Sequence, residues 1–205
     1  MEIKDFFEFS NNYVMSTVMA CAVGLKTDEN GKDDHWKLIR GDYEKIDFPV
    51  VFKQEHGKKL TDTLGTGWPS LYLISDRMKK ILEENQLTGW KTFPVKVYDK
   101  KGNEIFGYHG FSILGSCGPI DYSKSEIIEK SVRPNRPPSK YYKGLYVGLD
   151  QWDGTDFFMP PKTYEIIVTK KAADVLKKNK ITKIQLENLA DEEIWERSVS
   201  KKISE

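Results

Sequence analysis

The stretch LISDRMKKILEENQLT, residues 73–88, is matched 94 positions later, without a gap, by IVTKKAADVLKKNKIT, residues 167–182. Each copy begins with an apolar segment and a hydroxyl residue, Ser75 or Thr169, and continues with apolar residues three and four apart. That spacing places apolar side chains on one face of a helix. Ser and Thr favour helix N-termini, because their side-chain oxygen accepts a bond from a backbone N–H. Each copy therefore predicts a strand, a short amphipathic helix and a second strand.

The two copies also agree at their helix ends. Asn85 and Asn179 follow the last apolar turn, where a left-handed residue commonly ends a helix. Including the flanking strands, the repeated units extend to about residues 71–98 and 164–189. Two copies are too few for a solenoid. We therefore expect one α+β domain over residues 1–205, with a mixed, mostly antiparallel sheet, a few short helices and a duplicated strand–helix–strand unit.

Segments outside the quoted stretches carry further local signals. Alternating or short apolar runs predict strands, which are 36–40, 48–52, 93–98 and 105–114. Residues 99–103 have the composition of a turn. Three prolines and polar neighbours indicate a loop at 131–140. Residues 198–205 are expected to form a flexible tail.

The charge balance restricts the possible partners. Lys and Arg total 32 and Asp and Glu total 31, which gives a net charge of +1. Proteins that bind nucleic acid usually carry a marked basic excess, so we expect no nucleic-acid partner. The charges are nevertheless segregated, because residues 170–183 are rich in lysine and residues 187–196 are acidic.

Two features indicate the compartment. Cys21 and Cys117 allow at most one disulfide, unlike the pattern of a disulfide-rich secreted module. The apolar run at 13–25 has only 13 residues, whereas a membrane span needs about 20. Acidic residues precede that run, unlike the basic start of a signal peptide. We therefore expect a cytoplasmic protein without a membrane partner.

One group of residues has the chemistry of a catalytic set. His109, Cys117 and Asp121 could supply a base, a thiol nucleophile and an orienting carboxylate. No recognised cysteine-hydrolase signature surrounds them, and a cysteine is often simply a small buried apolar residue. A thiol-dependent hydrolase is therefore an alternative and not the favoured interpretation.

Other chemical motifs are weak. The three histidines are widely spaced, and the aspartates at 150, 153 and 156 lack the spacing of a calcium-binding loop. No phosphate-binding glycine pattern occurs. We therefore expect no metal and no cofactor. Trp68 and Trp152 lie in predicted loops, and exposed Trp residues are favoured at protein interfaces.

Several motifs between Thr61 and Leu189 resemble those of immunity protein family 11, known from bacterial polymorphic-toxin loci. The most specific are TGWKTFPV at 88–95 and WDGTD at 152–156. The others are TGW at 66–68, ISDR at 74–77, GYHG at 107–110 and GPIDYSKS at 118–125.

The resemblance implies a non-enzymatic protein that binds a cognate toxin and blocks it. It supplies no catalytic residues. The candidate partner-binding or motif residues are Trp68, Trp90, Tyr108, Asp121, Trp152, Asp153 and Asp156. They could equally form the scaffold behind an interface. A ligand-binding regulatory module remains a further alternative.

Overall fold

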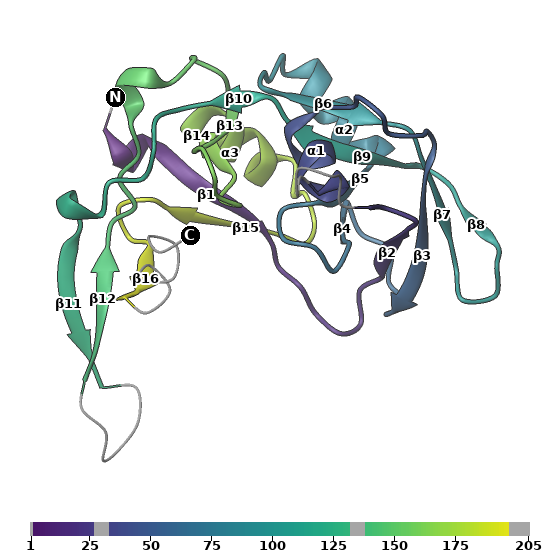
Figure 1. The fold of residues 1–205 in the computed structure, drawn as a ribbon, viewed down its shortest axis with the longest axis horizontal. Helices are drawn as coiled ribbons and strands as arrows, with labels where there is room; N and C mark the ends of the chain where they lie inside the picture. Colours follow the sequence, from purple (N-terminus) through teal and green to yellow (C-terminus); the bar gives the residue numbers. More distant parts are fainter. Residues whose placement is uncertain (1, 27–32, 132–137, 197–205) are drawn as a thin grey trace.

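The structure is a computed structural model that describes residues 2–26, 33–131 and 138–196. It confirms the α+β class (Figure 1). The described α-helices are α1 (Asp34–Arg40), α2 (Asp76–Glu84) and α3 (Lys170–Lys178). Short 3-10 turns are η1 (Ile3–Asp5), η2 (Tyr122–Lys124) and η3 (Leu149–Gln151).

The described strands form three sheets. The largest has the order β6 (Trp90–Phe93), β9 (Tyr108–Ile113), β5 (Tyr72–Ser75), β4 (Thr63–Gly65), β2 (Met19–Val23), β3 (Val50–His56), β7 (Val95–Tyr98) and β8 (Glu104–Ile105). The second has the order β10 (Gly115–Ser116), β13 (Phe157–Met159), β14 (Ile167–Thr169), β1 (Phe6–Asn11) and β15 (Ile184–Asn188). The third contains β11 (Glu126–Lys130), β12 (Ser139–Lys143) and β16 (Glu193–Trp195). Most pairings are antiparallel; the parallel pairs are β2 with β4, β3 with β7 and β10 with β13.

The duplicated strand–helix–strand unit is confirmed. Helices α2 and α3 begin and end at residues 94 apart, and so do the starts of β6 and β15. The Ser75 hydroxyl accepts a bond from Met78 N, and the Thr169 hydroxyl accepts one from Ala172 N. The expected caps therefore fix both helix starts.

The correspondence extends beyond the quoted stretches. Leu64 in β4 lies opposite Leu73, as Phe158 in β13 lies opposite Ile167. Each set has the spatial order strand, strand, inserted strand, strand: β4-β5-β9-β6 and β13-β14-β1-β15. We call β4, β5, α2, β6 and β9 the first unit, and β13, β14, α3, β15 and β1 the second unit.

The inserted strand comes from a different place in the chain in each unit. In the first unit β9 follows β6, whereas in the second unit β1 comes from the N-terminal segment. Phe111 in β9 lies opposite Thr92, and Phe9 in β1 lies opposite Leu186, which is 94 residues beyond Thr92. Residues with equivalent partners are called equivalent positions below.

The two units share one core. The Phe111 ring lies 6.3 Å from that of Phe9 and 5.6 Å from that of Phe157. Each helix contributes its apolar stripe to this core: Met78, Ile81 and Leu82 from α2, and Ala172, Ala173 and Leu176 from α3. A smaller cluster surrounds Phe6 and Phe158. Burial of one helical stripe in each unit supplies the packing energy that such short helices lack alone.

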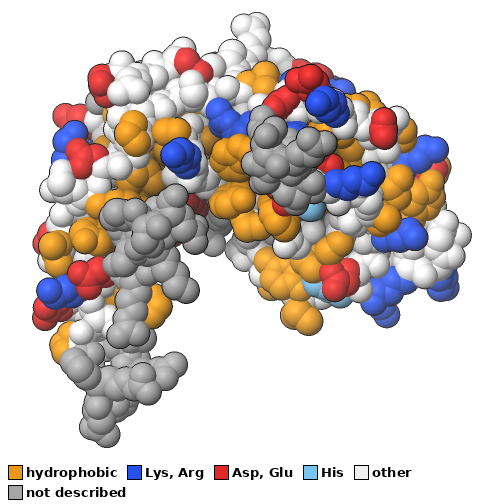
Figure 2. All heavy atoms as spheres, in the orientation of Figure 1, with side chains coloured by type: hydrophobic (Ala, Val, Ile, Leu, Met, Phe, Trp, Pro, Cys, Tyr) orange, Lys and Arg blue, Asp and Glu red, His pale blue; other side chains and the backbone are white. Residues whose placement is uncertain are grey.

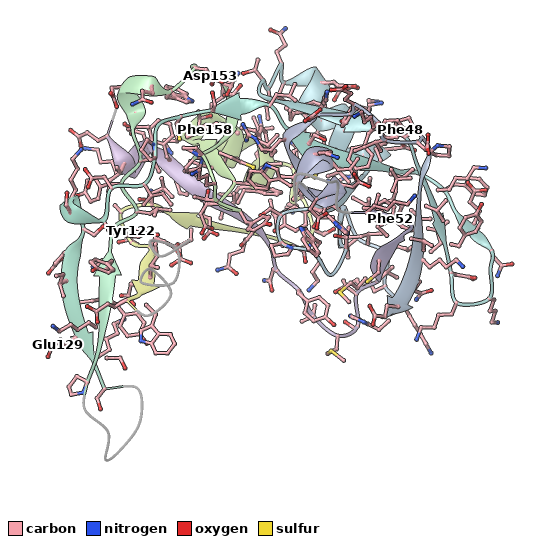
Figure 3. All side chains as sticks on the ribbon, viewed as in Figure 1. Phe48, Phe52, Tyr122, Glu129, Asp153 and Phe158 are labelled. Atoms are coloured by element: carbon pink, nitrogen blue, oxygen red, sulfur yellow. The ribbon has the colours of Figure 1, made fainter. Side chains whose placement is uncertain are left out.

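The third sheet forms an arm. Figure 1 shows β11, β12 and β16 extending to the lower left of the two units, and Figure 2 shows the molecule hollowed between this arm and the remainder. Tyr122 lies at the arm's base, 5.4 Å from the Tyr142 ring, and Glu129 lies further out (Figure 3).

Three local predictions are wrong. Residues 36–40 belong to helix α1, because Asp33 accepts a bond from His35 N at its start and left-handed Gly41 ends it. Residues 105–114 are not one strand, because Gly107, with φ of 82°, separates β8 from β9. Ser139 and Lys140, expected in a loop, pair in β12. Residues 132–137 and the expected tail at 198–205 lie outside the described residues.

The predicted left-handed residue is displaced by one position in both units. Asn85 and Asn179 have φ of −93° and −86°, and each donates its amide to the carbonyl four residues earlier. The next residues, Gln86 and Lys180, both have φ of 50°. The side-chain bond of Asn completes the helix end, so the reversal occurs one residue later.

Candidate functional site

Two buried aspartates at equivalent positions, Asp62 and Asp156, connect the units. Asp62 accepts bonds from Ser75 Oγ at 3.0 Å and Arg77 Nη1 at 2.7 Å in its own unit. It also accepts bonds from Thr182 N and Oγ1, at 2.9 and 2.8 Å, in the turn after α3. Burial opposes ionisation of Asp62, but these bonds outweigh it and lower its pKa.

Asp156 makes the reciprocal set of contacts. It accepts bonds from Thr169 Oγ1 at 2.9 Å and Lys171 Nζ at 3.1 Å. Thr88 N and Oγ1, in the turn after α2, donate at 3.0 and 3.3 Å. The candidate motif residue Asp156 therefore joins one unit to the other. Asp62 was not among the residues predicted from the sequence, although extending the 94-residue offset eleven positions upstream of residue 73 pairs it with Asp156.

Trp90 and Tyr108 also make internal bonds. The Trp90 indole donates to the carbonyl of Leu87 at 2.7 Å, and its ring centroid lies 6.0 Å from that of Phe111. The Tyr108 hydroxyl donates to the carbonyl of Thr61 at 2.8 Å. Burial raises the pKa of Tyr108 to about 12, so its hydroxyl stays protonated at neutral pH.

Trp152 and Asp153 shape the loop between η3 and β13. The Trp152 ring lies 5.3 Å from that of Phe6 in the smaller core, and its indole donates to the carbonyl of Thr155. Asp153 accepts a bond from Ser116 N at 2.8 Å, which ties the loop to β10. Figure 3 shows Asp153 at the outer surface and Phe158 beneath it.

The remaining two candidates lie apart from this loop. Asp121 begins η2, where it accepts bonds from Ser123, and these bonds lower its pKa. Trp68 stacks on His35 with ring centroids 4.1 Å apart. Its indole nitrogen is buried without a hydrogen-bond partner among the described residues. The seven candidates therefore do not form one site.

The structure does not assemble the predicted thiol set. Cys117 is 7% exposed and its thiol contacts the carbonyl of Gly118. Burial, with a contribution from Asp153, raises the pKa of Cys117 to about 12. His109 instead contacts Asp76, at 2.6 Å. No bond among the described residues joins Cys117, His109 and Asp121 to one another, and the thiol stays protonated at neutral pH.

Both cysteines are free. The Cys21 thiol donates to Glu55, and burial with this bond raises the pKa of Cys21 to about 11. Within the described ranges, no three His, Cys, Asp or Glu side chains are arranged to hold a metal ion. No helix in those ranges is long and apolar enough to cross a membrane.

The two units differ in chemistry at one cross-strand pair. In the first unit Phe93 lies opposite Gly110, where a Cβ atom would come within 2.1 Å of the Phe93 ring. The equivalent pair in the second unit is Glu187 opposite Glu8. Like charges directly opposite each other are destabilising. The second unit therefore carries an electrostatic cost that the first unit lacks.

Further acidic residues adjoin this pair. Burial, followed by repulsion from Glu8, Glu187 and Glu165, raises the pKa of Glu192 to about 8. One carboxylate oxygen of Glu192 is buried without a bond in the described structure. These residues come from opposite ends of the chain, so local sequence patterns give no sign that they meet.

The covering of this sheet face also differs. In the first unit α1 lies against β9, and the buried Ser112 hydroxyl donates to the carbonyl of Leu38. The equivalent Ser10 in the second unit is half-buried, and no described helix plays the part of α1 there. The second unit thus presents an acidic face that is less covered.

Comparison with known proteins identifies the relationship. The sequence profile of the Immunity protein family (Imm11) matches residues 20–191. No curated protein matches the chain. The matched range includes the reciprocal aspartates, all three described α-helices and the TGWKTFPV and WDGTD motifs. It leaves out β1. Because the profile covers most of the chain, this protein belongs to the Immunity protein family (Imm11).

Proposed function

We propose that this immunity protein acts in the cytoplasm, where it binds a cognate bacterial toxin and blocks it without catalysis. The family match over residues 20–191 carries the proposal. The buried, protonated thiol of Cys117 and its separation from the His109–Asp76 contact support a non-catalytic role. The free state of both cysteines is compatible with a reducing compartment.

The candidate motif residues divide into two roles in this proposal. Asp156, Trp90 and Tyr108 use their polar atoms within the protein, so we assign them to the scaffold. Asp153 is exposed on its loop and the Asp121 side chain is 40% exposed, so a toxin could reach both. Substituting a scaffold residue should lower the amount of folded protein, whereas substituting an interface residue should lower the affinity of folded protein.

The test is co-expression with the product of the neighbouring gene, which this proposal expects to be the toxin. We expect the chain to restore growth of cells that produce the toxin and to co-purify with it. Absence of both rescue and complex would contradict the proposal. Cys117→Ser separates the two function classes: a binding protein keeps its protection, whereas a thiol hydrolase loses it. Cys21→Ser, which changes the other free cysteine, is the matched control.

A further inference from the structure

A groove of about 260 Å³ lies between α3 and β15 in the second unit. Its lining residues are Leu176, Lys177, Lys180, Ile181, Ile184 and Leu186. Four of the six are aliphatic and two are lysines. Small-molecule pockets usually measure about 300 to 1,000 Å³. The groove therefore suits one inserted side chain better than a metabolite.

The first unit shows how such a groove is filled. Trp90 is equivalent to Ile184, and Leu87 is equivalent to Ile181. The Trp90 indole bonds the carbonyl of Leu87, so the ring lies at the junction between the end of α2 and β6. An internal aromatic ring thus covers this junction in the first unit. The smaller Ile184 side chain leaves the equivalent place open in the second.

The charge beside the groove also differs from that at the equivalent place in the first unit. Lys177 and Lys180 are equivalent to Glu83 and Gln86 of the first unit. The Lys177 ammonium lies 4.5 Å from the centre of the Phe7 ring, which holds the charge beside the groove. Two ammonium groups next to an apolar groove attract a segment that carries acidic residues.

The backbone of β15, next to the groove, can also bind a partner segment. Among the described strands, β15 is the last of its sheet, and it pairs there with β1 on one side only. An unpaired strand edge presents N–H and C=O groups to which an extended segment can add. The groove lies beside this edge, because Ile184 and Leu186 belong to β15. A bound strand could therefore place a side chain in the groove.

We propose that the groove between α3 and β15 receives an aromatic side chain of the toxin, presented on an extended segment with neighbouring Asp or Glu residues. This inference rests on the proposed function, because it requires a toxin partner. The aromatic ring takes the place that Trp90 fills in the first unit. Lys177 and Lys180 pair with the acidic neighbours of that ring.

The first experiment fills the groove from within. The full-length chain and its Ile184→Trp variant are titrated calorimetrically with a catalytically inactive form of the toxin domain that the co-expression test identifies. We expect the variant to bind at least about 100-fold more weakly, since a blocked central pocket has the effect of losing a hot-spot contact. Ile184→Val, which keeps the groove open, should stay within about threefold of the wild type.

The second experiment changes the charge and uses variants on one helix. Lys177→Glu introduces the residue of the first unit and should weaken binding by about tenfold, with a smaller dependence on salt. Lys178→Glu is the matched control, because Lys178 belongs to α3 but does not line the groove. This pair keeps the inference testable if Ile184→Trp does not fold, which its thermal unfolding curve reveals.

The outcomes separate the two proposals. If the wild-type chain does not bind the toxin domain, the proposed function is wrong. If the wild type binds and folded Ile184→Trp binds equally well, the toxin docks elsewhere and only the groove inference is overturned. Equal effects of Lys177→Glu and Lys178→Glu would also overturn it, because they would show a general charge effect.

Discussion

The first and second units have corresponding strand orders, and their helices begin and end at residues 94 apart. Their surfaces nevertheless differ in how they are covered. In the first unit α1 covers one sheet face and Trp90 occupies the junction between helix and strand. In the second unit the equivalent face carries Glu8 and Glu187, and the equivalent junction is a groove. The first unit covers these two places with residues of its own, whereas the second unit leaves them less covered.

The reciprocal aspartates Asp62 and Asp156 make equivalent contacts in the two units. Asp62→Ala and Asp156→Ala should each lower the free energy of unfolding by about 3 kcal/mol, because each removes a buried carboxylate that accepts several hydrogen bonds. Urea denaturation measures the change. Asp191→Ala, at an exposed position, should have little effect. A difference above about 1.5 kcal/mol between the two buried variants would show that the units are not energetically equivalent.

Trp90→Ile makes the first unit resemble the second. We expect it to lower the free energy of unfolding by about 2 kcal/mol, because a large ring is lost from a packed junction. Ile184→Trp should change it by less than about 1 kcal/mol, because the added ring enters existing space and displaces no core side chain. Thermal unfolding of both variants tests the comparison. A large destabilisation by Ile184→Trp would mean that the groove cannot hold an indole in the way the first unit does.

The acidic face predicts a pH dependence that the first unit cannot produce. The pKa of Glu192 rises from an ordinary value of 4.5 to about 8 in the folded protein, so between these values the folded state binds the extra proton. The stability from this group is therefore complete below about pH 4.5 and is lost as the pH rises to about 8. Glu192→Gln should remove this loss and raise the free energy of unfolding at pH 9 by about 1 to 2 kcal/mol, after allowance for solvent screening.

The measurement is chemical denaturation at pH 5 and pH 9. The stabilisation by Glu192→Gln should be near zero at the lower pH and largest at the higher pH. Glu126→Gln, an exposed position on β11, is the matched control and should show no such trend. An equal gain at both pH values would indicate that the change acts through packing and not through proton binding.

The sequence predicts these units well wherever a residue acts on its near neighbours. Ser75 and Thr169 cap helices three residues away, and the apolar stripes lie within each helix, so the repeat and its bounds can be read directly. The strand β1 could not be assigned in this way. It pairs with β14 and β15 from the other end of the chain, and the residues of its partner strands carry no local sign of it.

The same distinction between local and long-range contacts applies to the candidate site residues. Asp156, Trp90 and Trp152 were identified as motif residues, but their sequence neighbourhood did not show that their contacts are internal. The groove needed both the fold and the comparison of equivalent positions, because it is defined by an aromatic ring that the second unit lacks. Likewise Glu8 and Glu187 meet only through strand pairing, so their repulsion is invisible in the neutral total charge.

The smallest predicted effect tests the helix ends, where the units are again alike. Gln86 and Lys180 both have φ of 50°, a conformation that costs an ordinary residue more than glycine. Gln86→Gly and Lys180→Gly should therefore each raise the free energy of unfolding, by about 0.5 kcal/mol, because relief of backbone strain exceeds the greater freedom of glycine in the unfolded chain. Thermal unfolding checks both. If only Gln86→Gly stabilises, the Lys180 side chain contributes to folding as well as lining the groove, and the two units already differ at this turn in the free protein.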